Sequence, residues 1–135
     1  MDLDEARAFI GDNHRAVLAT FRADGRPQMS PVVVGLDDEG RPMISTREPA
    51  YKTRNVRRDP RVSLCMLSDD FWNWIQVDGR ATVIPLPEAM DLLVAYYRSV
   101  SGEHPDWDDY RRAMQEQQRV VLRVDIERAG PDRRL

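Results

Sequence analysis

The sequence predicts a mainly β domain of the α+β class: a small, closed or nearly closed antiparallel barrel of six strands with helices at its periphery. Strand-type segments follow one another through tight turns in the first half of the chain, and two longer helices come late. That order differs from the regular strand–helix alternation of a parallel sheet. The chain also lacks a G-x-G-x-x-G motif and a Walker loop. Closure is favoured because it removes exposed strand edges.

The first half of the chain predicts one helix followed by a β-meander. Residues 2–13 place their apolar side chains on one helical face, and an Asp near the start can cap the helix. The strands expected next are 14–22, 27–36 and 41–46. Asp24-Gly25 is a hairpin signal between the first two strands. Pro31 indicates that the second strand lies at an edge, contains a bulge, or needs no N–H at that position.

The second half alternates helices with apolar strands. Pro49 opens a short helix, and Asp59-Pro60 ends it because the residue before a proline disfavours helical geometry. Further along, the pattern predicts strands at 61–67, 72–84 and 119–126, and helices at 88–100 and 106–118. No linker or repeat interrupts the chain, so residues 1–135 are expected to form a single domain.

Bulk composition excludes several classes of function. The net charge of −3 and the pI near 5.4 argue against a nucleic-acid-binding protein. No apolar run approaches the length of a membrane helix, and the acidic N-terminus does not resemble a signal peptide. The single cysteine, Cys65, is compatible with a reducing compartment, so a cytoplasmic protein is expected. His14 and His104 are not spaced as zinc ligands, and no metal site is predicted.

The most basic stretch contains the only lysine of the chain, Lys52. No acidic residue lies between Pro49 and Arg58, and hydroxyl-bearing residues precede the stretch. Backbone N–H groups at a helix start, together with cationic side chains, form a receptor for a phosphate or carboxylate. The segment therefore predicts a site for a phosphate-bearing cofactor; the simpler alternative is a solvated basic helix face.

No residue is assigned as a catalytic acid, base or nucleophile. Cys65 lies in an apolar strand and is expected to be a buried small hydrophobe. Asp106 is expected to cap a helix, and His104 to be an exposed loop residue. An enzyme of hydride transfer can lack an evident acid/base pair, since a cofactor carries the chemistry and the protein positions it.

Several segments, taken in chain order, carry the resemblance to a known family. They are Val17-Leu18-Ala19-Thr20, Asp24-Gly25-Arg26-Pro27, Ser30-Pro31-Val32, the stretch 52–61, Val77-Asp78-Gly79-Arg80-Ala81 and the stretch 102–110. This order resembles the split β-barrel flavin and deazaflavin oxidoreductases related to pyridoxamine 5′-phosphate oxidase. It is most similar to the actinobacterial branch that uses coenzyme F420.

The resemblance implies a homodimer with two cofactor sites at the subunit interface. Phosphate-side contacts carry over to Lys52, Thr53, Arg54 and Asn55. The ring and ribityl side would be lined by Gln28, Ser30, Val32, Ser45 and Thr46. Trp74 and Gln76 would reach across from the partner subunit. For Ser30 the alternative is a bulge contact, and for Trp74 it is packing in the dimer core.

The implied reaction is hydride transfer from reduced coenzyme F420 to an unsaturated small organic acceptor. Arg57, Arg58 and Arg61 favour this cofactor, because its acidic oligoglutamate tail rewards extra cations. One alternative is an FMN-binding oxidase or flavin reductase on the same fold. Another is a non-catalytic protein that binds a cofactor or tetrapyrrole.

Overall fold

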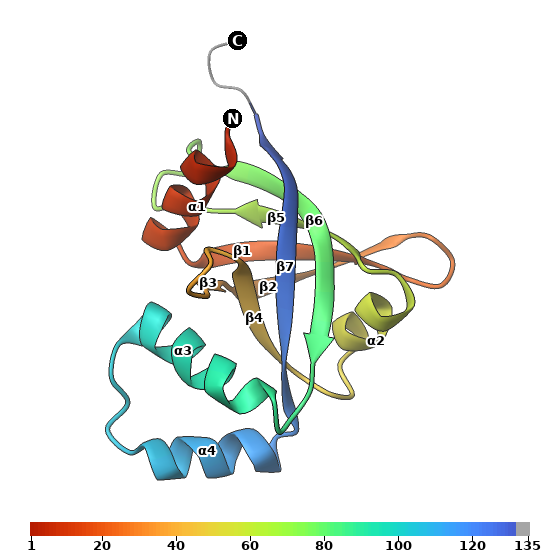
Figure 1. Ribbon diagram of the computed structural model, residues 1–135. Helices are drawn as coiled ribbons and strands as arrows, with labels where there is room; N and C mark the ends of the chain where they lie inside the picture. Colours follow the sequence, from red (N-terminus) through yellow and green to blue (C-terminus); the bar gives the residue numbers. More distant parts are fainter. Residues whose placement is uncertain (132–135) are drawn as a thin grey trace.

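The computed structural model describes residues 1–131, which form one curled antiparallel sheet with helices around it (Figure 1). The strands are β1 (Arg15–Phe21), β2 (Pro27–Val33), β3 (Gly35–Leu36), β4 (Pro42–Arg47), β5 (Arg61–Met66), β6 (Ile75–Ile84) and β7 (Arg119–Gly130). The helices are α1 (Leu3–Asp12), α2 (Tyr51–Arg58), α3 (Ala89–Ser101) and α4 (Trp107–Glu116). The mainly β, antiparallel fold class predicted from the sequence is confirmed.

The strand order forces the sheet to curl. It runs β2-β1-β5-β6-β7-β4-β3, and all neighbours are antiparallel. The two edge strands, β2 and β3, are consecutive in the chain and only Val34 separates them. The edges of the sheet must therefore come together, and the result is a split barrel that is open between β2 and β4. Pro31 lies in β2, which is an edge strand of the sheet. Of the three explanations given for Pro31 from the sequence, the edge position is therefore confirmed.

The structure has seven strands where six were predicted, because the expected strand 27–36 breaks at Val34. The Val34 N–H still donates to the His14 carbonyl at 2.7 Å. The next residue, Gly35, pairs instead with Met43 of β4. A Cβ on Gly35 would lie 2.5 Å from the Ser99 hydroxyl oxygen, so the chain passes close against α3 at this point. The alternation of inward and outward side chains continues across this change of pairing partner. The sequence pattern therefore does not reveal the break.

Two other strand boundaries differ from the prediction. The expected strand 72–84 begins only at Ile75. The residues before it form a turn, in which the Ser68 hydroxyl donates to the Asn73 carbonyl at 2.6 Å. In the same turn the Asp70 carboxylate accepts the Trp72 N–H at 3.0 Å. The last strand, predicted to end at residue 126, continues to Gly130 alongside β6.

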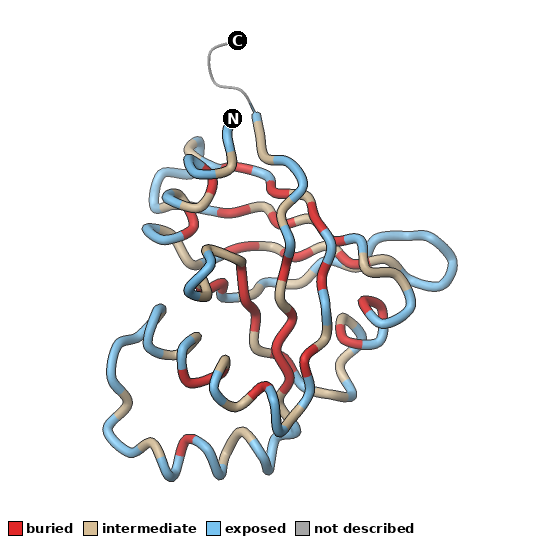
Figure 2. The backbone as a smooth tube through the Cα atoms, viewed as in Figure 1, coloured by how far each residue is buried: buried red, intermediate tan, exposed pale blue. Residues whose placement is uncertain are grey.

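The core has two parts (Figure 2). The barrel interior is filled by alternate residues of the strands, and Ala6 and Ile10 of α1 close one end. A second cluster joins Met43 and Val121 of the sheet to Leu93 of α3 and Tyr110 of α4. None of the helices described in residues 1–131 is long and apolar enough to cross a membrane.

Cys65 corrects one prediction. In β5 the buried residues are Val62, Leu64 and Met66, so Cys65 faces the outer side of the sheet and is only partly buried. The apolar composition of the segment had predicted a buried Cys65. Successive side chains of a strand point to opposite faces, so Cys65, between the buried Leu64 and Met66, faces outward.

Candidate functional site

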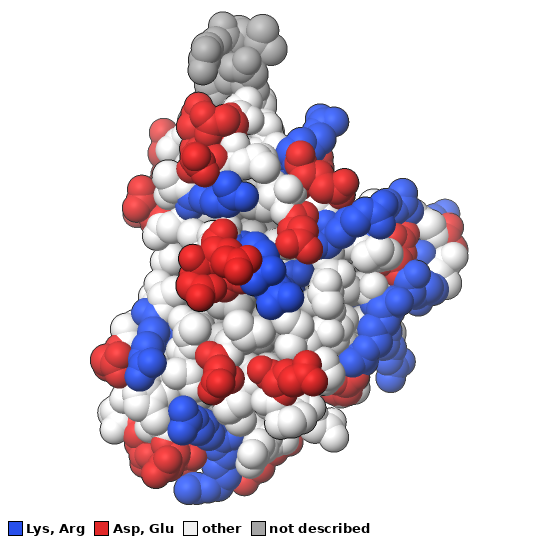
Figure 3. All heavy atoms as spheres, in the orientation of Figure 1, with Lys and Arg blue, Asp and Glu red and all other residues white. Residues whose placement is uncertain are grey.

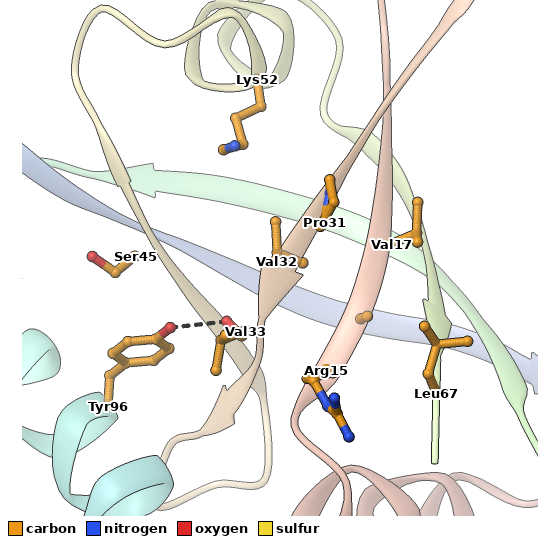
Figure 4. Close-up of a pocket in the computed structure, with 10 residues that line it drawn as sticks. Arg15, Val17, Pro31, Val32, Val33, Ser45, Lys52, Leu67 and Tyr96 are labelled. Carbon is orange, nitrogen blue, oxygen red and sulfur yellow. Dashed lines mark hydrogen bonds between the residues drawn. The ribbon is translucent and has the colours of Figure 1, made fainter. Parts of the chain in front are cut away.

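A groove of about 570 Å³ lies where the two edges of the sheet approach each other (Figure 4). Its lining comes from β1, β2, β4, α2, α3 and the residue after β5: Arg15, Ala16, Val17, Pro31, Val32, Val33, Ser45, Lys52, Leu67 and Tyr96. The middle of the groove is mainly apolar, and its two cations, Lys52 and Arg15, lie toward opposite ends (Figure 4). The volume is within the range of sites that bind small molecules and cofactors.

Tyr96 of α3 closes the opening between β2 and β4. Its hydroxyl donates to the Val33 carbonyl at 2.9 Å. Burial raises the pKa of the Tyr96 phenol, and a hydrogen bond from the Ser45 backbone opposes that rise. The phenol is therefore neutral at physiological pH and contacts both strands that flank the opening.

The Lys52 end of the groove suits an anion. Helix α2 begins after Ala50, which offers no side-chain cap, and its first turn contains no acidic residue. The Lys52 ammonium contacts the Ser30 hydroxyl at 3.4 Å and forms no ion pair among the residues described. An uncapped helix start beside an unpaired cation attracts phosphate or carboxylate groups.

Asn55 fixes α2 on the sheet. This buried side chain donates to the Thr20 hydroxyl at 3.1 Å and to the Gln28 amide oxygen at 2.9 Å. Its own oxygen accepts from Arg58 at 2.8 Å. Two residues earlier on α2, the buried Thr53 hydroxyl donates to the Arg47 carbonyl at 2.7 Å. These bonds set where Lys52 projects into the groove.

The structure brings together some of the residues predicted for the cofactor site and separates others. Those at the groove are Val32, Ser45 and Lys52, with Ser30 in contact with Lys52. Gln28 and Asn55 line a neighbouring hollow of about 470 Å³ together with Arg22, Ala23, Tyr51 and Arg58. Thr46 and Thr53 are buried, and Arg54 is exposed on α2.

Trp74 and Gln76 lie away from Lys52. They line a separate hollow of about 210 Å³ with Asp78, Arg128, Gly130 and Pro131. The sequence predicted Trp74 within the strand 72–84, but in the structure Trp74 precedes β6. The Gln76 amide donates to the Asp78 carboxylate at 2.9 Å. Within one subunit these two side chains do not approach the Lys52 groove.

Basic residues gather over α2 and the β1–β2 turn (Figure 3). Arg57 is paired with Glu48, and Arg61 is paired with Asp59 at 2.7 Å. Arg58 donates to the Phe21 carbonyl and to Asn55. The cations that the sequence suggested for an acidic tail are thus already engaged, although Arg58 still lines the hollow beside Asn55.

The residues set aside as catalytic candidates lie elsewhere. Asp106 caps α4 by accepting the Asp109 N–H, which confirms the prediction. His104 is not simply exposed: its Nδ1 atom accepts the Asp106 N–H at 2.9 Å, and its ring packs among aromatic side chains. No group of three or more metal-ligating side chains occurs in the part of the chain that the structure describes.

Several groove residues were missed by the sequence reasoning, among them Arg15, Leu67 and Tyr96. Tyr96 falls within the helix predicted at 88–100, and no local signal shows that its hydroxyl reaches the edge of the sheet. Arg15 occupies an outward position at the start of β1, which by itself indicates only a solvated strand face.

The family model for pyridoxamine 5′-phosphate oxidase matches residues 3–131. An F420H(2)-dependent biliverdin reductase of Mycobacterium tuberculosis is 30% identical over 127 residues, which cover 93% of this chain and 84% of the relative. A conserved hypothetical protein of the same species superposes with a TM-score of 0.78 at 26% identity, covering 96% of this chain and 82% of that one. A solved structure described as an F420 reductase has a TM-score of 0.71 at 19% identity, covering 92% of this chain and 94% of that one.

Proposed function

Because the chain belongs to the pyridoxamine 5′-phosphate oxidase family, we propose that it is an oxidoreductase that binds coenzyme F420 and reduces an unsaturated small organic acceptor. The observation that carries this proposal is an apolar groove with an unpaired cation and an uncapped helix start at one end. A cofactor with a flat ring and a phosphate matches this groove, because the ring suits the apolar walls and the phosphate suits the Lys52 end.

The residues present fit such a cofactor. Lys52 and the first N–H groups of α2 would hold the phosphate, with Ser30 orienting the Lys52 ammonium. Val32 and Pro31 would cover the ring, and Ser45 offers a hydroxyl at the opposite wall. When bound, the reduced deazaflavin supplies a hydride, and the acceptor takes up that hydride together with a proton from water. The apolar walls exclude other water from the reacting atoms.

Two observations favour coenzyme F420 over FMN. The relative with 30% identity is named for its dependence on reduced F420. In addition, the hollow formed by Gln28, Tyr51, Asn55, Arg22 and Arg58 adjoins the Lys52 region through helix α2. It has two arginines for the acidic tail that F420 carries beyond its phosphate and FMN lacks.

We further propose a homodimer, in which Trp74 and Gln76 of one subunit approach the groove of the other. The outer face of β2 and β1 is rich in apolar side chains, and Met29 on β2 is 68% exposed; Trp74, before β6, is 38% exposed. A partner subunit would cover such a face. Sedimentation of the purified protein should show a dimer, and Trp74→Ala should weaken it. A monomer at micromolar concentration would contradict this proposal.

A parallel fluorescence titration with coenzyme F420 and FMN tests the choice of cofactor. We expect F420 to bind at least tenfold more tightly than FMN. Oxidation of reduced F420 in the presence of a neutral quinone such as menadione then tests the reductase activity. Tighter binding of FMN would move the chain to the flavin-dependent members of the family, and binding of neither would contradict the proposed function.

A further inference from the structure

Arg15 lies where the groove continues into a second hollow. This hollow, of about 320 Å³, is lined by Arg15, Leu67, Ser68, Asp69 and Phe71. It shares Arg15 and Leu67 with the groove that contains Lys52. The two hollows therefore adjoin at Arg15 and Leu67, which lie at the end of the groove away from Lys52 (Figure 4). The second hollow adds about 320 Å³ to the groove of about 570 Å³, so the Arg15 end leaves room for a second molecule beside a cofactor at the Lys52 end.

The Arg15 guanidinium is held only loosely. Its acidic partner is Asp69, at 3.1 Å, and the two side chains are 75% and 99% exposed. Exposed pairs of this kind contribute only about 0–1 kcal/mol. The residues paired with Arg15 across the sheet are apolar, namely Val33 on β2 and Leu67 after β5. A ligand carboxylate can thus replace Asp69 at little cost and meet no competing acid on these two strands.

Phe71 lines the same hollow, and the ring of Trp72 packs against that of Phe71. Phe71 is 77% and Trp72 is 81% exposed, and their ring centroids lie 4.9 Å apart in an edge-on arrangement. The turn that carries them is ordered by the Ser68 and Asp70 hydrogen bonds described above. Large aromatic side chains left in solvent offer a stacking surface for a planar molecule.

We propose that this end of the groove binds the hydride acceptor, that the acceptor is planar, conjugated and bears a carboxylate, and that Arg15 recognises the carboxylate. The inference rests on the proposed function, which places the cofactor at the Lys52 end. Asp69 holds the guanidinium toward the hollow until an acceptor carboxylate replaces it. Phe71 and Trp72 cover the conjugated part of the acceptor. Arg15 thus determines which acceptors are used and takes no part in the chemical step.

Equilibrium binding of a matched pair of probes tests this inference without any cofactor. Biliverdin has two propionate groups, and its dimethyl ester keeps the tetrapyrrole but carries an uncharged methyl ester in place of each carboxylate. Quenching of tryptophan fluorescence by each probe gives the two affinities. The wild-type protein should bind the diacid about tenfold or more tightly than the ester, as expected for a charge-assisted hydrogen bond. Arg15→Gln should abolish that preference and leave the ester affinity unchanged.

Two variants sharpen the test. Asp69→Asn frees Arg15 and should increase the diacid affinity a few-fold without changing that of the ester. Arg112→Gln removes an equal charge from the distant helix α4 and should keep the wild-type preference. Equal affinities for both probes in the wild type, a preference that survives Arg15→Gln, or no binding of either probe would overturn the proposal. Failure of the proposed function shows separately, as absence of F420 binding and of quinone reduction.

Discussion

The Tyr96 hydroxyl donates a 2.9 Å hydrogen bond to the Val33 carbonyl, and this bond ties helix α3 to the edge strand β2. The Ser45 backbone on β4 lies near the same hydroxyl and opposes the rise in its pKa. Tyr96 thus lies at the opening between β2 and β4, two strands that are not paired with each other in the sheet. It also forms part of the groove wall, so the stability of the barrel and the shape of the site depend on one side chain.

Tyr96→Phe should lower the free energy of unfolding by about 0.5–1.5 kcal/mol, the usual net contribution of one hydrogen bond. Urea denaturation measures this change. Tyr97→Phe is the matched control on the same helix: Tyr97 packs through its ring against His104 and Trp107, so loss of its hydroxyl should have a smaller effect. Equal effects of the two substitutions would show that the bond to Val33 does not stabilise the split barrel.

Asn55→Ala should lower the free energy of unfolding by about 1–3 kcal/mol, because it leaves the buried Thr20 hydroxyl and the Gln28 amide without their donor. Asn13→Ala, which removes a single half-buried hydrogen bond to the Phe9 carbonyl, is the control and should cost less. Thermal or urea unfolding gives both values. If Asn55→Ala costs no more than Asn13→Ala, α2 is not fixed to the sheet by this network.

Gly79→Ala should destabilise the protein by at least about 2 kcal/mol. A Cβ at this position would lie 2.2 Å from the Asp125 carbonyl oxygen, at the register shift between β6 and β7. Backbone on both sides of the clash has to move. Gly11→Ala in α1 is the control, since its nearest neighbour would be a Leu36 side-chain carbon at 3.8 Å. That substitution should be neutral or stabilising, and similar values for the two would contradict the close approach of β6 and β7.

The stability of the protein should fall in alkaline solution through Tyr110. Burial raises the pKa of the Tyr110 phenol to about 12, above the value of about 10 in an unfolded chain. The folded state therefore favours the neutral phenol, and the resulting stabilisation is complete below about pH 10 and is lost as the pH rises toward 12. Tyr110→Phe should flatten the decrease between these pH values in denaturation curves. An unchanged decrease would show that the pKa of the Tyr110 phenol is the same in the folded and unfolded states.

Tyr110→Phe also has an expected cost at neutral pH. The Tyr110 hydroxyl donates to the Leu93 carbonyl at 2.8 Å and joins α4 to α3. Its loss should remove about 1 kcal/mol at pH 7. Tyr51→Phe, at a position that is 70% exposed, is the control for both measurements and should change neither.

The fold was predictable because most of its signals are local. Asp24-Gly25 marks the turn between β1 and β2, Asp59 ends α2, and Pro31 indicates the edge position of β2. The break at Val34 was not predictable, since it depends on Gly35 passing close to Ser99, far away in the chain. The composition around Trp72 and Trp74 predicted a strand. The segment before Ile75 instead forms a turn, in which the Ser68 hydroxyl donates to the Asn73 carbonyl and the Asp70 carboxylate accepts the Trp72 N–H.

The site was predictable only in part, for a similar reason. Lys52 stood out because a lone lysine follows a helix start without local acids. Arg15 and Tyr96 join it in the groove only because β1, β2 and α3 meet in space. Arg57 and Arg61 looked available as cations, but Glu48 and Asp59 pair with them in the folded chain. Contacts between distant segments decide which charges remain free.

The measurement that tests the central claim most directly is the dissociation constant of coenzyme F420 for Lys52→Ala, beside the wild type and Arg112→Ala. Both variants lose one positive charge, but only Lys52 lines the groove. Loss of a charge-assisted hydrogen bond to the cofactor phosphate should weaken binding by about 1.5–3 kcal/mol, or roughly 10- to 150-fold. Arg112→Ala should bind as the wild type does. Unchanged binding by Lys52→Ala would contradict the assignment of this groove as the cofactor site.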